Sequence, residues 1–182
     1  MKFKQYLAAG LFAMILAASV RADEIIDNPQ YQSWAKHKPG TSVTLQSDMV
    51  AGTLSQSRQT MQTLVSIDEN NATVQMTMDM GPSAPALRQI SLIPAKVEKS
   101  REGIPLNYAG TLKEIGKETV QIAGKSYNCV VTEFTGRNAQ GTAVGKFWRT
   151  VEIPGGMAKM ELTVTARGTQ NLKTTVLTME LK

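Results

Sequence analysis

The stretch that decides the fold reads TVQMTMDM over residues 73–80, and apolar and polar side chains alternate along its whole length. Val74, Met76, Met78 and Met80 fall on one side of an extended chain, and the polar residues fall on the other. A period of two is typical of an antiparallel strand with one face against a core and one face in water. The stretch therefore predicts a half-buried strand.

Further segments with strand-like patterns lie on both sides of this stretch. Residues 41–49, with Val43 and Leu45 on one face, and residues 60–67 are predicted strands upstream. In a strand over residues 86–97, Pro94 favours an edge or a bulge because proline cannot donate a ladder hydrogen bond. The remaining predicted strands are residues 119–123 and 126–134, which flank a hairpin turn at Gly124-Lys125, then 144–151, 160–167 and 174–181, the last with Leu177, Met179 and Leu181 on one side.

One short helix precedes the strands. Asn28 is a typical N-cap and Pro29 a typical first helical residue, so the helix is predicted to run from there to about His37. Tyr31 and Trp34 are three residues apart and share a face, which we expect to pack on the sheet.

The fold class that follows is mainly β. We expect residues 23–182 to form a single domain, built as a curved antiparallel meander sheet or a partly closed barrel with one short N-terminal helix. Alternation on every strand predicts one apolar face and one wet face. The apolar face needs a cover, which is a second sheet, closure of the same sheet, the helix or a ligand.

The first 22 residues predict a cleaved secretory signal peptide. Lys2 and Lys4 precede an uncharged, mostly apolar run from Tyr6 to Val20, and cleavage is expected after Ala22. That run is shorter than the roughly 20 residues of a spanning helix, so we do not expect an integral membrane protein after cleavage. The predicted location is the periplasm or the extracellular space.

Charge and cysteine content narrow the function classes. Residues 1–22 hold three of the 20 basic residues and none of the 15 acidic ones, so residues 23–182 have a net charge of only +2. This mixed surface gives no reason to expect nucleic acid as a partner. Cys129 is the only cysteine, so no intramolecular disulfide forms and the core depends on packing.

No residue pattern predicts an active site, and no catalytic residue or cofactor is assigned. The chain lacks a glycine-rich phosphate loop, a G-x-S-x-G motif and an H-E-x-x-H motif. Cys129 is either a thiol nucleophile or, as is common for cysteine, a small buried apolar residue. His37 lies between Lys36 and Lys38 at the expected helix end. A single histidine and a single cysteine do not make a zinc site.

Met76, Met78 and Met80 form a row of thioethers, which are soft ligands that suit Cu(I). The same row is explained by core positions of a strand, where methionine fills irregular gaps. The alternation alone accounts for the row, so no metal ligand is assigned.

Several segments occur in a characteristic order along the chain. They are Asn28-Pro29 with Trp34, then Lys38-Pro39-Gly40-Thr41, then Ile122-Ala123-Gly124-Lys125 before the Cys129 strand, and finally Lys146-Phe147-Trp148-Arg149-Thr150 before Ile153-Pro154-Gly155-Gly156-Met157-Ala158-Lys159-Met160. This layout resembles exported bacterial β-sheet proteins similar to the LolA/LolB-like lipoprotein-carrier superfamily. The resemblance implies an unclosed barrel whose concave apolar face binds acyl chains or another apolar ligand. The chain differs in having one short helix where the carriers of that family use helices as a lid.

Three hypotheses follow. The first is a non-catalytic exported protein that binds an apolar ligand, such as a lipid or acyl chain, or a protein partner in the cell envelope. The second is a structural or interaction module of an envelope complex that uses exposed strand edges. The third is an enzyme that uses Cys129 with His37, and it requires the two side chains to lie within hydrogen-bond reach of each other. Cu(I) binding through the methionine row is a further, less favoured alternative.

Overall fold

Strands follow one another along almost the entire described chain. The computed structural model describes residues 23–80, 85–101, 108–139, 141–165 and 168–182, so the predicted signal peptide lies outside the described residues, as do Ala166 and Arg167 of a predicted strand. The elements are β1 (Ile25–Asp27), α1 (Pro29–Trp34), β2 (Ser42–Ala51), β3 (Leu54–Ile67), β4 (Asn71–Met78), β5 (Leu87–Pro94), β6 (Lys96–Glu98), a 3₁₀ turn (Lys99–Arg101), β7 (Ala109–Ile122), β8 (Lys125–Asn138), β9 (Gly141–Arg149), β10 (Met157–Thr165) and β11 (Thr169–Glu180).

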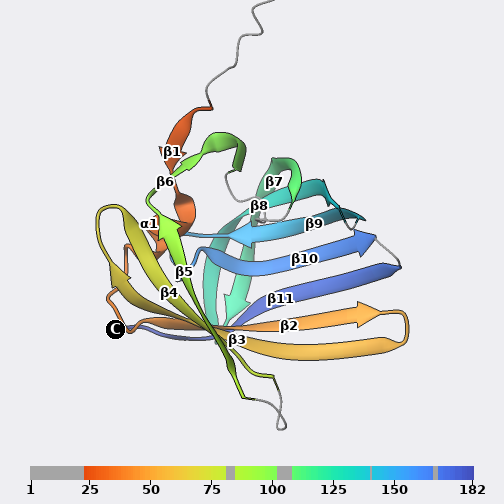
Figure 1. The fold of residues 1–182 in the computed structure, drawn as a ribbon, viewed down its shortest axis with the longest axis horizontal. Helices are drawn as coiled ribbons and strands as arrows, with labels where there is room; N and C mark the ends of the chain where they lie inside the picture. The colour runs from red at the N-terminus through yellow and green to blue at the C-terminus, as the bar shows by residue number, and fades with distance from the viewer. Residues whose placement is uncertain (1–22, 81–84, 102–107, 140, 166–167) are drawn as a thin grey trace, which may run out of the picture.

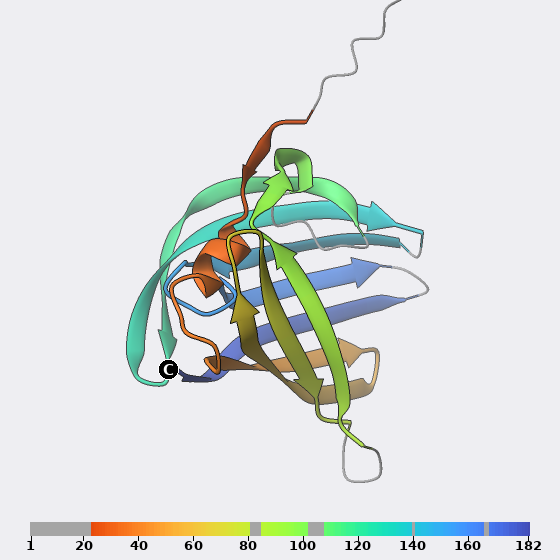
Figure 2. The same ribbon diagram turned by 60° about the vertical axis from the view of Figure 1, so that its left-hand side comes forward.

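Nine of these strands form one antiparallel sheet in the order β5-β4-β3-β2-β11-β10-β9-β8-β7, and β1 pairs with β6 separately. The sheet has two free ends, β5 and β7, so it is not closed into a barrel. Figures 1 and 2 show it strongly curved, with β7 and β8 bending round one side and β4 and β5 standing beside α1. The predicted curved antiparallel sheet with one short N-terminal helix is confirmed, and β5 is an edge strand, as Pro94 indicated.

The strand register defines two faces. Leu64 lies opposite Val74, and Leu162 lies opposite Leu172, so these side chains share what we call the apolar face. The residues between them along each strand make up the other face, which we call the charged face. Val43 and Leu45 are both buried on the apolar face, as predicted.

Helix α1 begins as the sequence indicates. The Asn28 side chain accepts a hydrogen bond from the Gln30 backbone N–H at 3.0 Å, and Pro29 follows the cap. Trp34 is fully buried in the core and Tyr31 packs beside it, which confirms their predicted role. The helix ends at Trp34 rather than His37, because the His37 N–H bonds to the Trp34 carbonyl in a tighter, three-residue turn. Among the described residues, no helix has the length and apolar composition that crossing a bilayer requires.

The expectation of one wet face is wrong at one end of the sheet. Phe147 and Trp148 are consecutive in β9 and point to opposite faces, yet both are buried. Tyr127, Cys129 and Val131 also lie on the charged side of β8 and are buried. These residues are buried because of tertiary contacts. Strand β7 curls far enough to contact β10 and β11, which are not its neighbours in the sheet.

Two local predictions are corrected by backbone geometry. The hairpin turn consists of Ala123 and Gly124, with φ angles of 48° and 79°, so Lys125 already belongs to β8. In β11 the register shifts between Val176 and Thr178, so Val176 is buried while Leu177 is 44% exposed. A bulge adds one residue and reverses the side on which the following residues point.

Candidate functional site

A cluster of aromatic and aliphatic side chains forms the apolar face between β8 and β10. Phe134, Ala143, Phe147 and Leu162 are buried there. Phe134 contacts both Tyr108 and Phe147 edge-to-face, with ring centroids 5.8 Å apart in each pair. We call these buried residues the open cluster.

Glycines let the Phe134 ring lie close to the sheet. A Cβ atom on Gly136 would be 2.3 Å from Phe134 Cζ, and one on Gly110 would be 2.8 Å from Phe134 Cε2. Gly145 is tighter still, because a Cβ there would be 2.1 Å from the Glu161 carbonyl oxygen. Glycine within a strand often marks such a close approach. The floor of this region is therefore closely packed.

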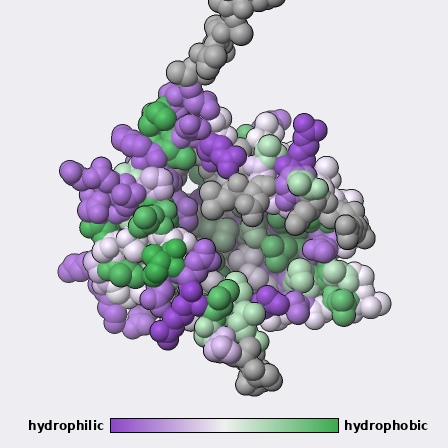
Figure 3. Space-filling view, in the orientation of Figure 1, coloured by the Kyte–Doolittle hydropathy of each residue, from purple (hydrophilic) through white to green (hydrophobic). Residues whose placement is uncertain are grey.

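Around this floor the apolar face is only partly covered. The hydrophobic side chains that pack against the open cluster remain half-buried. Figure 3 shows a hollow near the centre of this side of the molecule, with apolar surface visible inside it. The half-buried side chains are Tyr108, Leu112, Met157, Met160, Val164 and Leu172.

Few polar groups reach this region. The Arg149 guanidinium lies 4.7 Å from the centroid of the Phe147 ring. The Thr132 hydroxyl is buried and finds no hydrogen-bond partner among the described residues. Thr132 lies opposite Phe147 in the register, so its hydroxyl belongs to the same apolar face. The arrangement suits binding of apolar groups better than acid–base chemistry.

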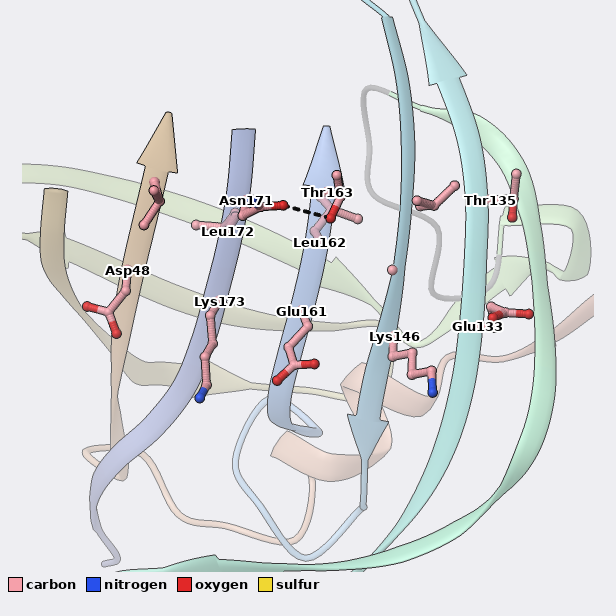
Figure 4. Close-up of a pocket in the computed structure, with 13 residues that line it drawn as sticks. Asp48, Glu133, Thr135, Lys146, Glu161, Leu162, Thr163, Asn171, Leu172 and Lys173 are labelled. Carbon is pink, nitrogen blue, oxygen red and sulfur yellow. Dashed lines mark hydrogen bonds between the residues drawn. The ribbon is translucent and has the colours of Figure 1, made fainter. Parts of the chain in front are cut away.

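The charged face carries a groove of about 800 Å³ over β2 and β8–β11 (Figure 4). Cross-strand neighbours alternate in sign along one row, which we call the charge ladder. No local sequence pattern indicates the charge ladder, because its members come from six strands and their alignment depends on register. The ladder consists of Asp48, Lys173, Glu161, Lys146, Glu133 and Lys113.

The contacts of the ladder are mostly longer than an ion pair. Glu161 pairs with Lys159 of its own strand, at 2.8 Å, and no ion pair within 4.0 Å joins Lys146 or Lys173 to a described carboxylate. Hydrogen bonds from Gln46 and then Ser57 lower the pKa of Asp48, and the charge of Lys173 adds a smaller lowering. The ladder keeps this face hydrated and close to neutral.

The residues proposed for nucleophilic chemistry are not arranged for it. Cys129 is 1% exposed, and burial, followed by the charge of Glu152, raises the pKa of its thiol. A raised pKa disfavours the reactive thiolate. Burial, followed by the charge of Lys36, lowers the pKa of His37. The Cys129 thiol has its hydrogen bond with the Tyr127 carbonyl, at 3.7 Å, and no hydrogen bond joins it to His37.

The methionine row is shorter in the sheet than in the sequence. β4 ends at Met78, so Met80 lies beyond the strand and is 43% exposed. Met76 and Met78 are half-buried on the apolar face, and the Ser91 hydroxyl lies 3.7 Å from the Met76 sulfur. No group of three or more His, Cys, Asp or Glu side chains in the described part of the chain is placed to hold a metal. Cu(I) binding stays an untested prediction.

No family model matches the chain, and no curated protein matches it. Similar solved structures include an outer membrane lipoprotein-sorting protein domain from Vibrio parahaemolyticus, at 9% identity and TM-score 0.33, covering 85% of this chain and 91% of that one. A hypothetical lipoprotein from Escherichia coli has 15% identity and TM-score 0.36, over 82% and 88% of the two chains. A LolA superfamily protein from Nitrosomonas europaea has 10% identity and TM-score 0.25, over 86% and 94%.

These neighbours include the superfamily that the sequence layout resembles. Every TM-score is below 0.5 and every identity is 15% or lower. This likeness therefore does not identify a ligand for the chain.

Proposed function

We propose that the chain is a non-catalytic carrier that binds a lipid or another acyl chain on the open part of its apolar face, outside the cytoplasm, after removal of residues 1–22. The observation that carries the proposal is the half-burial of Leu112, Met160, Val164 and Leu172, which pack against the open cluster and leave apolar surface uncovered. Contiguous apolar surface of this kind marks ligand or partner sites in soluble proteins.

Burial of apolar surface supplies the binding energy. Each CH₂ group removed from water contributes about 0.8 kcal/mol, so an acyl chain gains affinity with length until the hollow is filled. Polar anchors are few, so we expect selection by chain length more than by headgroup. The central row of the charged face is the charge ladder, so we place the acyl chain on the apolar face.

The test uses two neighbouring residues that point to opposite faces. Leu172 lies on the apolar face and Lys173 on the charged face, opposite Leu162 and Glu161 respectively. Binding of a fluorescent long-chain fatty acid should weaken at least about tenfold in Leu172→Glu, a loss of about 1.4 kcal/mol. Lys173→Gln should bind within about twofold of the unchanged chain.

Folding must be checked in parallel by circular dichroism and thermal melting. Leu172→Ala is the milder variant, which keeps the test valid if the glutamate variant does not fold. Equal loss of binding in Leu172→Ala and Lys173→Gln contradicts the proposal. So does native mass spectrometry of the protein from its host, if it shows a bare chain that also binds no added acyl probe.

An interaction module of an envelope complex is the second candidate function. The observation that favours it is the exposed apolar edge strand β5, which carries Ile90 and Leu92 at 57% and 67% exposure. Affinity purification from the cell envelope separates the two functions, because a module brings the same protein partner each time and a carrier brings a lipid.

A further inference from the structure

Strand β5 carries apolar side chains at positions where the neighbouring strand β4 carries polar ones. Ile90 lies opposite Gln75 and Leu92 opposite Thr73, so both lie on the polar side of this part of the sheet. They are 57% and 67% exposed. Single exposed apolar residues are ordinary, but two at consecutive outward positions on one strand break the alternation that the neighbouring strand keeps.

The same strand has an unprotected backbone edge. β5 ends the nine-stranded sheet, and no other described strand pairs with its outer side. Every second residue of such an edge presents its N–H and C=O groups outward, which is a template for another strand. The usable segment is residues 87–93, because Pro94 lacks an N–H and its carbonyl accepts the Asn28 side-chain amide at 2.8 Å.

The opposite edge of the sheet is protected by two devices. β7 carries Lys113, Glu114, Lys117 and Glu118 along its length. Its register shifts between Glu114 and Gly116, so the edge is bulged at Ile115. Charges and bulges are the usual means by which proteins prevent edge pairing. The described residues of β5 have a single charge, Arg88, and a regular register with β4.

We infer that β5 pairs antiparallel with β5 of a second copy of this chain, about a twofold axis at Ile90. Residue 90 is the centre of segment 87–93, so this register uses the whole available edge. Ile90 then meets the partner's Ile90, and Gln89 meets the partner's Ser91. Arg88 meets the partner's Leu92, so the two arginines are not opposite each other.

The twofold symmetry of this pairing favours a second copy of the chain as the partner of the β5 edge. A twofold contact uses the same patch on both subunits, and this edge is compatible with itself in side-chain type and charge. Ile90 and Leu92 of both copies form one apolar group on the polar side of the sheet, which removes their exposure. Aliphatic cross-strand pairs of this kind stabilise antiparallel pairing. The inference does not depend on the apolar ligand, because it uses the edge and not the hollow.

Cysteine cross-linking tests the register. In an antiparallel pair, directly opposite Cα atoms are about 4.5–5.5 Å apart, within the range of a disulfide. Mild oxidation of Ile90→Cys should give a disulfide-linked dimer in at least about tenfold higher yield than Gln89→Cys, whose two copies are about 8 Å apart in this register. The unchanged chain is the blank, since its Cys129 is buried.

Sedimentation velocity tests the association without a cysteine. The unchanged chain should shift from monomer toward dimer as its concentration is raised, and Ile90→Lys should remain monomeric. Ile115→Lys is the matched control, since Ile115 is 43% exposed on the opposite edge, and it should dimerise like the unchanged chain. Both sites are exposed, so neither change should unfold the monomer.

Three outcomes overturn the inference. The first is a monomer at every concentration together with no cross-link from Ile90→Cys. The second is a cross-link from Gln89→Cys or Ser91→Cys in place of Ile90→Cys, which moves the axis. The third is a heterologous protein bound to β5 that Ile90→Lys releases. Acyl binding is measured separately and is expected to survive Ile90→Lys, so failure here is distinguishable from failure of the carrier proposal.

Discussion

The two halves of the apolar face are built from the same alternating pattern and end in different states. At the end of the strands nearest α1, which we call the covered half, α1 and the segment before β10 close the surface, and Trp34, Leu64 and Ile153 are 0% exposed. At the opposite end of β8–β11, the open half, Phe134 is equally buried but Leu172 and Met160 at its margin are not. Periodicity creates an apolar face, and only a covering element decides whether that face becomes core or binding surface.

The largest expected effect is a loss of stability caused by a substitution in the covered half. Trp34→Ala removes a fully buried aromatic side chain, so we expect it to lower the free energy of unfolding by about 3–5 kcal/mol. Leu172→Ala in the open half should cost much less, because Leu172 already contacts solvent. Urea denaturation of both variants measures the difference. Similar losses would mean that the two halves do not differ in cover.

A smaller effect is expected in the floor of the open half. Gly145→Ala places a Cβ about 2.1 Å from the Glu161 carbonyl oxygen, and backbone cannot give way cheaply. Overpacking of this kind costs about 1–3 kcal/mol. The control is Val144→Ala, since Val144 is 50% exposed on the other face. A melting temperature that falls no further in Gly145→Ala than in Val144→Ala would show that the β9–β10 contact is looser than described.

The charge ladder behind the open half should respond more weakly. Lys173→Glu places three acidic residues side by side on adjacent strands, with Asp48 and Glu161 as neighbours. Like charges directly opposite each other are destabilising by roughly 0.2–1 kcal/mol, and salt screens the effect. Chemical denaturation at low and high salt measures it. Adding Asp48→Lys should restore most of the loss, and a loss unchanged by salt or by this second change would exclude an electrostatic cause.

The smallest expected effect concerns pH and the covered half. Burial lowers the pKa of His37, so the unfolded chain binds a proton more readily than the folded one. The stabilising contribution is therefore complete above the ordinary histidine pKa and is lost as pH falls through and below it. Denaturation midpoints should fall between about pH 8 and about pH 5, and less so in His37→Gln. An identical slope in the variant would assign the pH dependence to carboxylates.

Local patterns predicted most of the secondary structure because they depend on neighbouring residues. The alternation at residues 73–80 located β4, Asn28-Pro29 located the start of α1, and Pro94 indicated an edge strand. Predictions of which side chains face the core failed where one extra residue in a strand exchanges the two faces for the residues that follow it. The register shift after Val176 reverses which side chains face the core, and it has no reliable sequence signal.

The sequence predicts that the fold has an apolar face, but it does not predict which residues form the candidate site. Cover of the apolar face by a ligand is one of the four possibilities that the sequence leaves open, but the sequence does not identify Leu112, Met160 and Leu172 as the margin of that face. Their exposure depends on which elements curl over them. The charge ladder was missed for a related reason, since Lys146 and Glu161 become neighbours only through the β9–β10 register.

The sequence by itself determined that this chain forms antiparallel strands with an apolar side, because alternation acts between residues two apart on the same strand. Tertiary structure alone decided which part of that side is closed by α1, which part stays open, and which charges line up behind it. Those outcomes depend on curvature, bulges and register, which are set by contacts between segments far apart in the chain.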